Sequence, residues 1–134
     1  MSLRDQNRTE KLPKDNGDKD WLYLNLEIFP DPIINQDKAK LTKYEQIDID
    51  LITWRTLIMI SLNKMYGLIG ESSPFEIPAE LSSKSIILKI QTEDKEKFNN
   101  SLLSYTFNLN KYTELDLNCY IKIKKSAHYV ALVM

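Results

Sequence analysis

The stretch of sequence that decides the fold is residues 21–29, WLYLNLEIF. From Leu22 to Ile28 every second residue is an aliphatic one, which is the period of a β-strand with one buried face. Residues 85–91, SIILKIQ, are rich in β-branched side chains and predict a second strand in the centre of the sheet. Residues 74–78, bounded by two prolines, predict a short edge strand.

Two segments have helical periodicity. Residues 50–66, DLITWRTLIMISLNKMY, start at an aspartate that can cap a helix and stop before Gly67, a residue suited to a helix C-terminus. Thr92 can cap a second helix, expected over about residues 93–106. In the first helix we expect one broad apolar arc to cover the sheet, formed by Trp54, Met65, Ile58, Leu51, Leu62, Tyr66, Met59 and Ile52.

The end of the chain alternates again, over residues 115–124 and then 127–134, which predicts two antiparallel strands with a turn near Lys125 and Ser126. Residues 30–46 are polar and poorly periodic and predict a long exposed loop insert. The resulting order is β-α-β-β-α-β-β. It predicts an α+β, ferredoxin-like two-layer sandwich, with an antiparallel sheet and two helices on one of its faces.

Length and charge limit the classes of function. The 134 residues suit one domain; residues 1–20, with five basic and five acidic side chains, predict a flexible tail before a single domain at 21–134. Eighteen Lys and Arg against nineteen Asp and Glu leave a net charge of −1, too little to gather nucleic acid by bulk attraction. The lone Cys119 indicates a reducing compartment, and no apolar run is long enough to predict a membrane segment.

Side chains that could carry catalysis are few. The sequence has no Walker loop, GxGxxG, HExxH or GxSxG motif. His128 is expected to be a surface or interface imidazole, and Cys119, beside Leu117 and Ile121 on one strand face, a buried thiol. We therefore expect no catalytic residue, no metal site and no cofactor.

The first helix carries a predicted partner interface. Leu57 and Ile60 point away from its apolar arc, which favours a second face buried against another chain, with Met59 and Arg55 as further interface residues. Scattered exposed apolar residues are the alternative. Arg55 falls inside the arc, so its guanidinium needs a carboxylate, a carbonyl or a phosphate; a structural salt bridge and a partner or RNA contact both stay open.

The sheet face without helices is a candidate RNA surface. It is expected to present Tyr23 together with aromatic and basic side chains that we predict as RNA contacts, namely Lys122, Lys124, Lys125, Lys89 and Tyr120. However, the third strand lacks the aromatic residues with which RNA-recognition motifs stack bases. Lysines that keep a strand edge from aggregating are an equally good explanation of the cluster.

Two long segments resemble a known family. Residues 47–72, IDIDLITWRTLIMISLNKMYGLIGES, and residues 86–106, IILKIQTEDKEKFNNSLLSYT, are similar to a small protein subunit of eukaryotic ribonuclease P and ribonuclease MRP, more narrowly to the fungal processing-of-precursors subunit eight family. The resemblance covers roughly residues 20–107. Its carrying residues are Thr53, Trp54, Arg55, Tyr66, Gly67, Gly70, Glu71, Asp94, Lys95, Phe98, Ser101 and Tyr105, with Trp21, Leu24 and Leu26 extending it.

This resemblance implies an RRM-like sandwich that cleaves nothing itself, since catalysis belongs to the RNA subunit. It implies a heterodimer with a paralogous RRM-like subunit, a TIM-barrel-like subunit flanking that pair, and limited direct contact with the catalytic RNA. The complete particle would process precursor tRNA at its 5′ end, or precursor ribosomal RNA in the MRP form. A location in the nucleus and nucleolus is implied as well.

Three hypotheses follow. The first is a non-catalytic ribonucleoprotein scaffold subunit that dimerises through the first helix. The second is an independent RRM-type protein that binds single-stranded RNA through Tyr23 and Tyr120. The third is an enzyme of the acylphosphatase kind, which needs an anion-binding arginine in a glycine-bearing loop, and no such loop follows the first strand.

Overall fold

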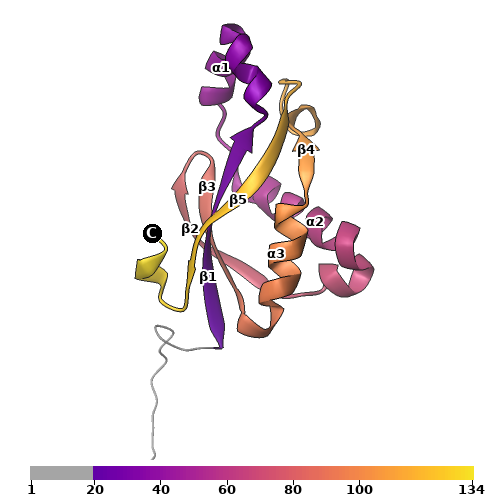
Figure 1. Ribbon diagram of the computed structural model, residues 1–134, viewed down its shortest axis with the longest axis vertical. Helices are drawn as coiled ribbons and strands as arrows, with labels where there is room; N and C mark the ends of the chain where they lie inside the picture. The colour runs from indigo at the N-terminus through magenta and orange to yellow at the C-terminus, as the bar shows by residue number, and fades with distance from the viewer. Residues whose placement is uncertain (1–19) are drawn as a thin grey trace, which may run out of the picture.

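The computed structural model describes residues 20–134 (Figure 1). Its strands are β1 (Trp21–Pro30), β2 (Phe75–Ser82), β3 (Ser85–Gln91), β4 (Thr106–Asn108) and β5 (Asn118–Ala127). Its α-helices are α1 (Lys38–Glu45), α2 (Leu51–Glu71) and α3 (Lys95–Leu103). Apart from Asp20, the predicted tail at residues 1–20 lies outside the described residues.

The strands form one antiparallel sheet in the order β2-β3-β1-β5-β4, so the first strand of the chain lies at its centre. Helices α2 and α3 lie on the same side of this sheet (Figure 1). The predicted α+β, ferredoxin-like sandwich is confirmed. The strands predicted at 21–29 and 85–91 are confirmed as β1 and β3.

The core forms between these two layers. Alternate residues of β1, from Leu22 to Ile28, are at most 4% exposed, as the period of two predicts. They pack in one cluster with side chains of α2 and α3, including Trp54, Leu62 and Phe98, all fully buried. The sheet and the two helices therefore stabilise each other through one continuous apolar layer.

The insert at residues 30–46 is not an unstructured loop, so that prediction was wrong. Asp31 accepts a hydrogen bond from the Ile33 N–H and begins the 3₁₀ turn Pro32–Gln36, and Asp37 caps α1 by accepting from the Lys40 N–H. Tyr44 of α1 is buried, and its hydroxyl donates to the Ile28 carbonyl at 3.0 Å. A few well-placed apolar side chains thus fix a segment whose average composition is polar.

The C-terminal prediction was also wrong. Residues 115–124 and 127–134 do not form two strands: β5 runs through the predicted turn, with an irregular register opposite Asn25 and Leu26, and a 3₁₀ turn, Val130–Leu132, follows. The remaining strand is β4, which pairs with the first residues of β5. Helix α3 accordingly ends at Leu103, before the predicted limit of 106.

Helix α2 carries the surface of interest. Its cap is confirmed, because the Asp50 carboxylate accepts from the Thr53 N–H at 2.8 Å. Gly67 has a φ of 66°, a conformation that favours glycine, but the chain resumes helical geometry and reaches Glu71. Gly67 is thus a kink and not the end of the helix.

Candidate partner and nucleic-acid interfaces

The outer face of α2 carries an apolar stripe that residues 20–134 leave largely uncovered. Ile52 is 76% exposed and Met59 38% exposed, on the side of the helix away from the sheet, and Ile60 borders them, half-buried against the core. Met59 and Ile60, with Thr56, Asn63 and Glu71, line a shallow cavity of about 430 Å³. We call Ile52, Met59 and Ile60 the α2 stripe. An apolar floor with a polar rim is the composition of a protein interface.

The stripe differs from the predicted interface, because it includes Ile52 and leaves out Leu57 and Arg55. Leu57 is fully buried in the core and cannot contact a partner, so its prediction was wrong. Ile60 is half-buried against the same core, so only part of its side chain is available to contact a partner. The predicted arc is confirmed only in part: Trp54, Ile58 and Leu62 are buried as predicted, and Leu57 is buried beside them. The other arc residues Leu51, Ile52, Met59 and Met65 are at least 38% exposed.

Arg55 lies beside the stripe. Its side chain is exposed, contrary to the expectation of a packed stem, and its guanidinium lies 5.8 Å from the centre of the Phe75 ring. None of the described carboxylates pairs with Arg55, so the structural salt bridge is not formed within residues 20–134, and a cation–π contact with Phe75 stands in its place. Contact of Arg55 with a partner or with RNA stays a prediction.

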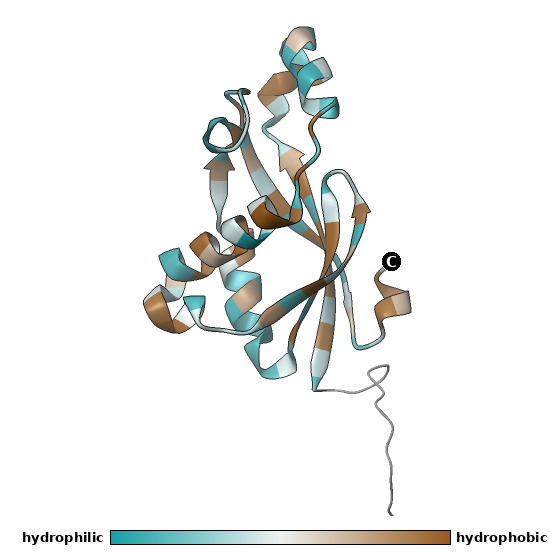
Figure 2. Ribbon diagram, turned by 180° about the vertical axis from the view of Figure 1, so that it is seen from behind, coloured by the Kyte–Doolittle hydropathy of each residue, from teal (hydrophilic) through white to brown (hydrophobic). Residues whose placement is uncertain are grey.

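A second apolar patch lies at the far end of α2. The kink at Gly67 turns Leu68 and Ile69 outward, 79% and 76% exposed. Figure 2 shows the brown, hydrophobic end of this helix at the margin of the molecule. We call Leu68 and Ile69 the α2 tip.

The face of the sheet opposite the helices is partly closed. Val130 and Val133 of the C-terminal segment pack over Tyr23 and Ile87, leaving Tyr23 only 3% exposed. The Asn25 side chain donates from Nδ2 to the Val133 carbonyl at 2.6 Å. Figure 1 shows this segment on the side of the sheet away from α2 and α3. Tyr23 is therefore not available to stack on a base, which contradicts the hypothesis of RNA binding through Tyr23.

The other end of this face stays open. Phe29 of β1 and Tyr120 of β5 are a cross-strand pair whose rings stack 5.9 Å apart at 20°. The Lys122 ammonium lies 4.8 Å from the Phe29 ring centre and 6.0 Å from that of Tyr120. Lys124 pairs with Glu27 at 2.9 Å. We call Phe29, Tyr120 and Lys122 the ring–lysine cluster.

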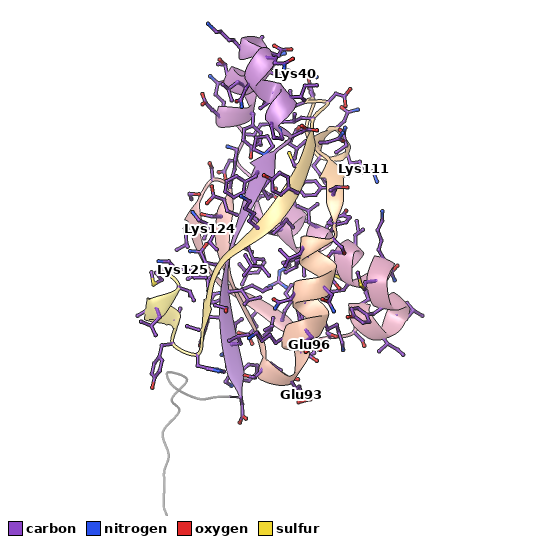
Figure 3. All side chains as sticks on the ribbon, in the orientation of Figure 1. Lys40, Glu93, Glu96, Lys111, Lys124 and Lys125 are labelled. Carbon is purple, nitrogen blue, oxygen red and sulfur yellow. The ribbon has the colours of Figure 1, made fainter. Side chains whose placement is uncertain are left out.

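The structure thus separates the five predicted RNA contacts into two groups. Tyr120, Lys122 and Lys124 come together at one end of β5. Lys125 donates instead to the backbone carbonyl of Met134, at 3.4 Å, and Lys89 lies over the Trp21 ring at the opposite end of β1. Figure 3 shows Lys124 and Lys125 on the side of the C-terminal segment. Phe29 was not among the predicted RNA contacts, although the alternation of β1 places its side chain on the same sheet face as that of Tyr23.

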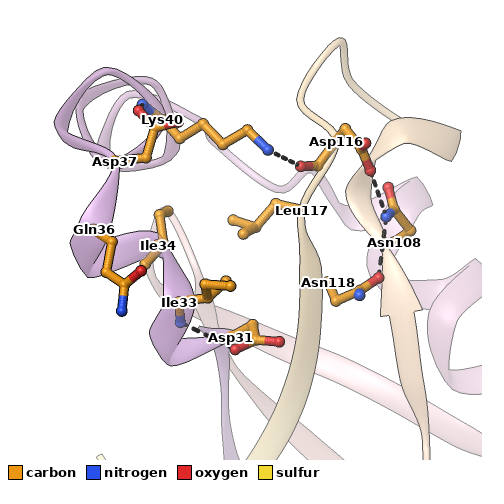
Figure 4. A pocket seen from close by; sticks show the side chains of 10 residues that line it. All are labelled: Asp31, Ile33, Ile34, Gln36, Asp37, Lys40, Asn108, Asp116, Leu117 and Asn118. Atoms are coloured by element: carbon orange, nitrogen blue, oxygen red, sulfur yellow. Dashed lines mark hydrogen bonds between the residues drawn. The ribbon is translucent and has the colours of Figure 1, made fainter.

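A further cavity, of about 470 Å³, lies between the insert and the β4–β5 edge (Figure 4). Lys40 crosses it and donates to the Asp116 carbonyl at 2.9 Å, while the Asn108 amide donates to the side chains of Asp116 and Asn118. The Lys40 bond ties α1 to the segment that precedes β5, and the Asn108 bonds join that segment and β5 to β4. Within residues 20–134 no group of His, Cys, Asp and Glu is arranged to hold a metal ion.

Cys119 and His128, the thiol and the imidazole considered above, are a buried group and a hydrogen-bonded group. Burial raises the pKa of the Cys119 thiol to about 12, so the thiolate is scarce near neutral pH. Nδ1 of His128 is hydrogen-bonded to the Trp21 carbonyl at 2.8 Å. Both observations agree with the structural roles expected for these residues.

The Cys119 thiol should be unreactive in the native chain. At pH 8 we expect iodoacetamide to alkylate it at least about a hundredfold more slowly than in the denatured chain. In the unfolded chain the thiol loses its proton above the ordinary cysteine pKa of about 8.5, whereas in the folded chain it keeps its proton up to a pH of about 12. Raising the pH between these two values therefore favours the unfolded chain and should lower the free energy of unfolding. Mass spectrometry after timed quenching measures the first effect; equal native and denatured rates would contradict it.

Comparison with known proteins identifies the family. The family model of the ribonucleases P/MRP protein subunit Pop8 matches residues 20–105, from the start of β1 to the end of α3. The chain belongs to the Pop8 family. The α2 stripe and the α2 tip both lie within the matched residues, whereas β5 and the C-terminal segment lie beyond them.

A solved structure supports the fold of this Pop8-family chain. A chain in the cryo-EM structure of yeast ribonuclease MRP is similar with a TM-score of 0.64 and 19% identity, over 88% of this chain and 78% of the other. At that identity the likeness shows the fold alone. No curated protein matches the sequence. None of the described helices has the length and apolar character needed to cross a bilayer.

Proposed function

We propose that this Pop8-family subunit is a non-catalytic scaffold of the ribonuclease P/MRP ribonucleoprotein. In this role it braces the catalytic RNA during 5′ processing of precursor tRNA, and of precursor ribosomal RNA in the MRP form. It does so as one half of a heterodimer with a paralogous RRM-like subunit. The observation that carries the proposal is the α2 stripe, an uncovered apolar surface on a helix that already buries its other face.

The charge of the chain supports a subunit held by protein contacts. A net charge of −1 supplies no general attraction for RNA, whereas Ile52 and Met59 offer apolar area that a partner removes from water. The buried thiol of Cys119 and the hydrogen-bonded His128 support a role without catalysis.

The α2 tip is a second protein contact in this proposal. Leu68 and Ile69 are exposed near the end of α2, two to three residues before Glu71, which lines the same cavity as Met59 and Ile60. We assign this tip to the TIM-barrel-like subunit that flanks the pair, so that the two apolar surfaces serve two different partners. The whole assembly would reside in the nucleus and nucleolus.

Co-expression tests the proposal. The full chain is produced with a tagged paralogous subunit, and the complex is analysed by affinity capture and gel filtration with light scattering. We expect a stable 1:1 complex in which amide exchange is slowed along the outer side of α2. Recovery of the chain as a separate monomer, with the paralogue present and folded, would refute the heterodimer.

A further inference from the structure

We propose that the ring–lysine cluster is a stacking site for an unpaired nucleotide of single-stranded RNA. Phe29 and Tyr120 would form the platform for the base, and Lys122 would contact the adjacent phosphate. This adds a direct RNA contact to a subunit whose proposed function rests on protein contacts alone, and it does not depend on the paralogous partner.

The platform is built into the sheet. Phe29 and Tyr120 are opposite each other in the register of β1 and β5, so backbone pairing fixes the positions of both rings. The rings stack at 5.9 Å and 20°, and both side chains are half-buried, which leaves part of each ring open to solvent. Every nucleobase has a π face, so such a pair of rings accepts a base without regard to sequence.

The charge at the platform is complementary to a nucleotide. Lys122 is exposed and lies over both rings, and it forms no ion pair with a described carboxylate. Lys124 next to it is already paired with Glu27. Because the Lys122 ammonium rests on the rings only by a cation–π contact, an incoming base can displace it toward the phosphate of the same nucleotide.

The surroundings of the rings favour a nucleotide over a protein partner. Thr106 and Asn108 of β4 pair with Tyr120 and Asn118 of β5 and lie on the same sheet face. The Thr106 hydroxyl can meet a base edge or a ribose, whereas the Asn108 amide is already bonded to Asp116 and Asn118. The exposed aliphatic side chain of Ile33 lies across the cavity that Asn108 and Asn118 line. The α2 stripe, in contrast, consists of isoleucine and methionine, as a protein interface requires.

The covered part of the face limits the size of the site. The C-terminal segment closes the sheet around Tyr23, several residues along β1 from Phe29. Only the end of the sheet at β5 and β4 is left open. The site therefore accommodates one or two nucleotides, and the affinity of the isolated chain should be modest.

Binding of labelled RNA by the full chain tests the site. The probes are an oligouridylate of about eight nucleotides and an abasic oligomer of the same length, measured by fluorescence anisotropy at two salt concentrations. We expect the oligouridylate to bind about tenfold more tightly than the abasic oligomer. Tyr120→Leu should remove most of that difference. Lys122→Gln should weaken binding. It should also reduce the slope of log affinity against log salt concentration by about one, which corresponds to the loss of one phosphate contact.

A matched control exists on α2. Lys64 also lies over an aromatic ring, that of Tyr105, at 5.6 Å, so Lys64→Gln removes an equivalent charge and cation–π contact away from the platform. Lys64→Gln should bind the oligouridylate as the unaltered chain does. Thermal unfolding followed by circular dichroism verifies that each variant is folded, and Tyr120→Leu keeps an apolar side chain for that reason.

Three results would overturn the site. They are equal affinity for the abasic oligomer, unchanged binding by Tyr120→Leu and Lys122→Gln, and absence of binding to the oligouridylate. None of them affects recovery of the heterodimer with the paralogous subunit, so a failure of the stacking site is distinguishable from a failure of the proposed function.

Discussion

Replacing Leu57 with alanine is expected to lower the free energy of unfolding by about 2–5 kcal/mol. The side chain is fully buried, so the substitution leaves a cavity between α2 and the sheet. A single domain has about 5–15 kcal/mol of stability in all, and the loss is therefore a large share of it. Urea denaturation followed by tryptophan fluorescence measures the change.

Ile52→Ala is the matched control, because Ile52 belongs to the same helix and is 76% exposed. Its substitution should change the free energy of unfolding by less than about 0.5 kcal/mol. If Leu57→Ala kept its stability but no longer captured the paralogous subunit, Leu57 would be an interface residue after all, and the packing described for α2 would be wrong.

The orientation of α2 shows what periodicity can and cannot predict. The cap at Asp50 was recognisable because it depends on local backbone geometry, whereas Gly67 was predicted to end the helix and instead kinks it. The buried side was predicted only for Trp54, Ile58 and Leu62, because apolar residues occupy almost every direction around this helix. When both faces are apolar, only contacts with the sheet decide which residues, such as Leu57 or Ile52, become core.

The C-terminal half illustrates a second limit. Alternation correctly predicted that the side chains of Tyr120 and Lys122 lie on the sheet face opposite the helices. It could not reveal that the strand continues through Lys125 and Ser126, since an irregular register resembles a turn in sequence. Nor could any local pattern predict that Val133 returns to cover Tyr23, a contact between residues at opposite ends of the domain.

Introducing lysine at both Ile52 and Met59 is expected to weaken binding of the paralogous subunit about a hundredfold or more. The two substitutions remove the apolar centre of the α2 stripe, and burying either ammonium against a partner would cost further free energy of binding. The fold itself should persist, because the two side chains are 76% and 38% exposed. Capture of the untagged chain by the tagged paralogue, with unfolding midpoints measured in parallel, gives both results.

Ile33→Lys provides the matched control. Ile33 is 62% exposed, so this variant makes the same chemical change at an exposed isoleucine that lies on the insert and not on α2. It should be captured as efficiently as the unaltered chain. Full capture of the Ile52→Lys, Met59→Lys variant would show that the heterodimer forms through a different surface, such as the α2 tip with its exposed Leu68 and Ile69.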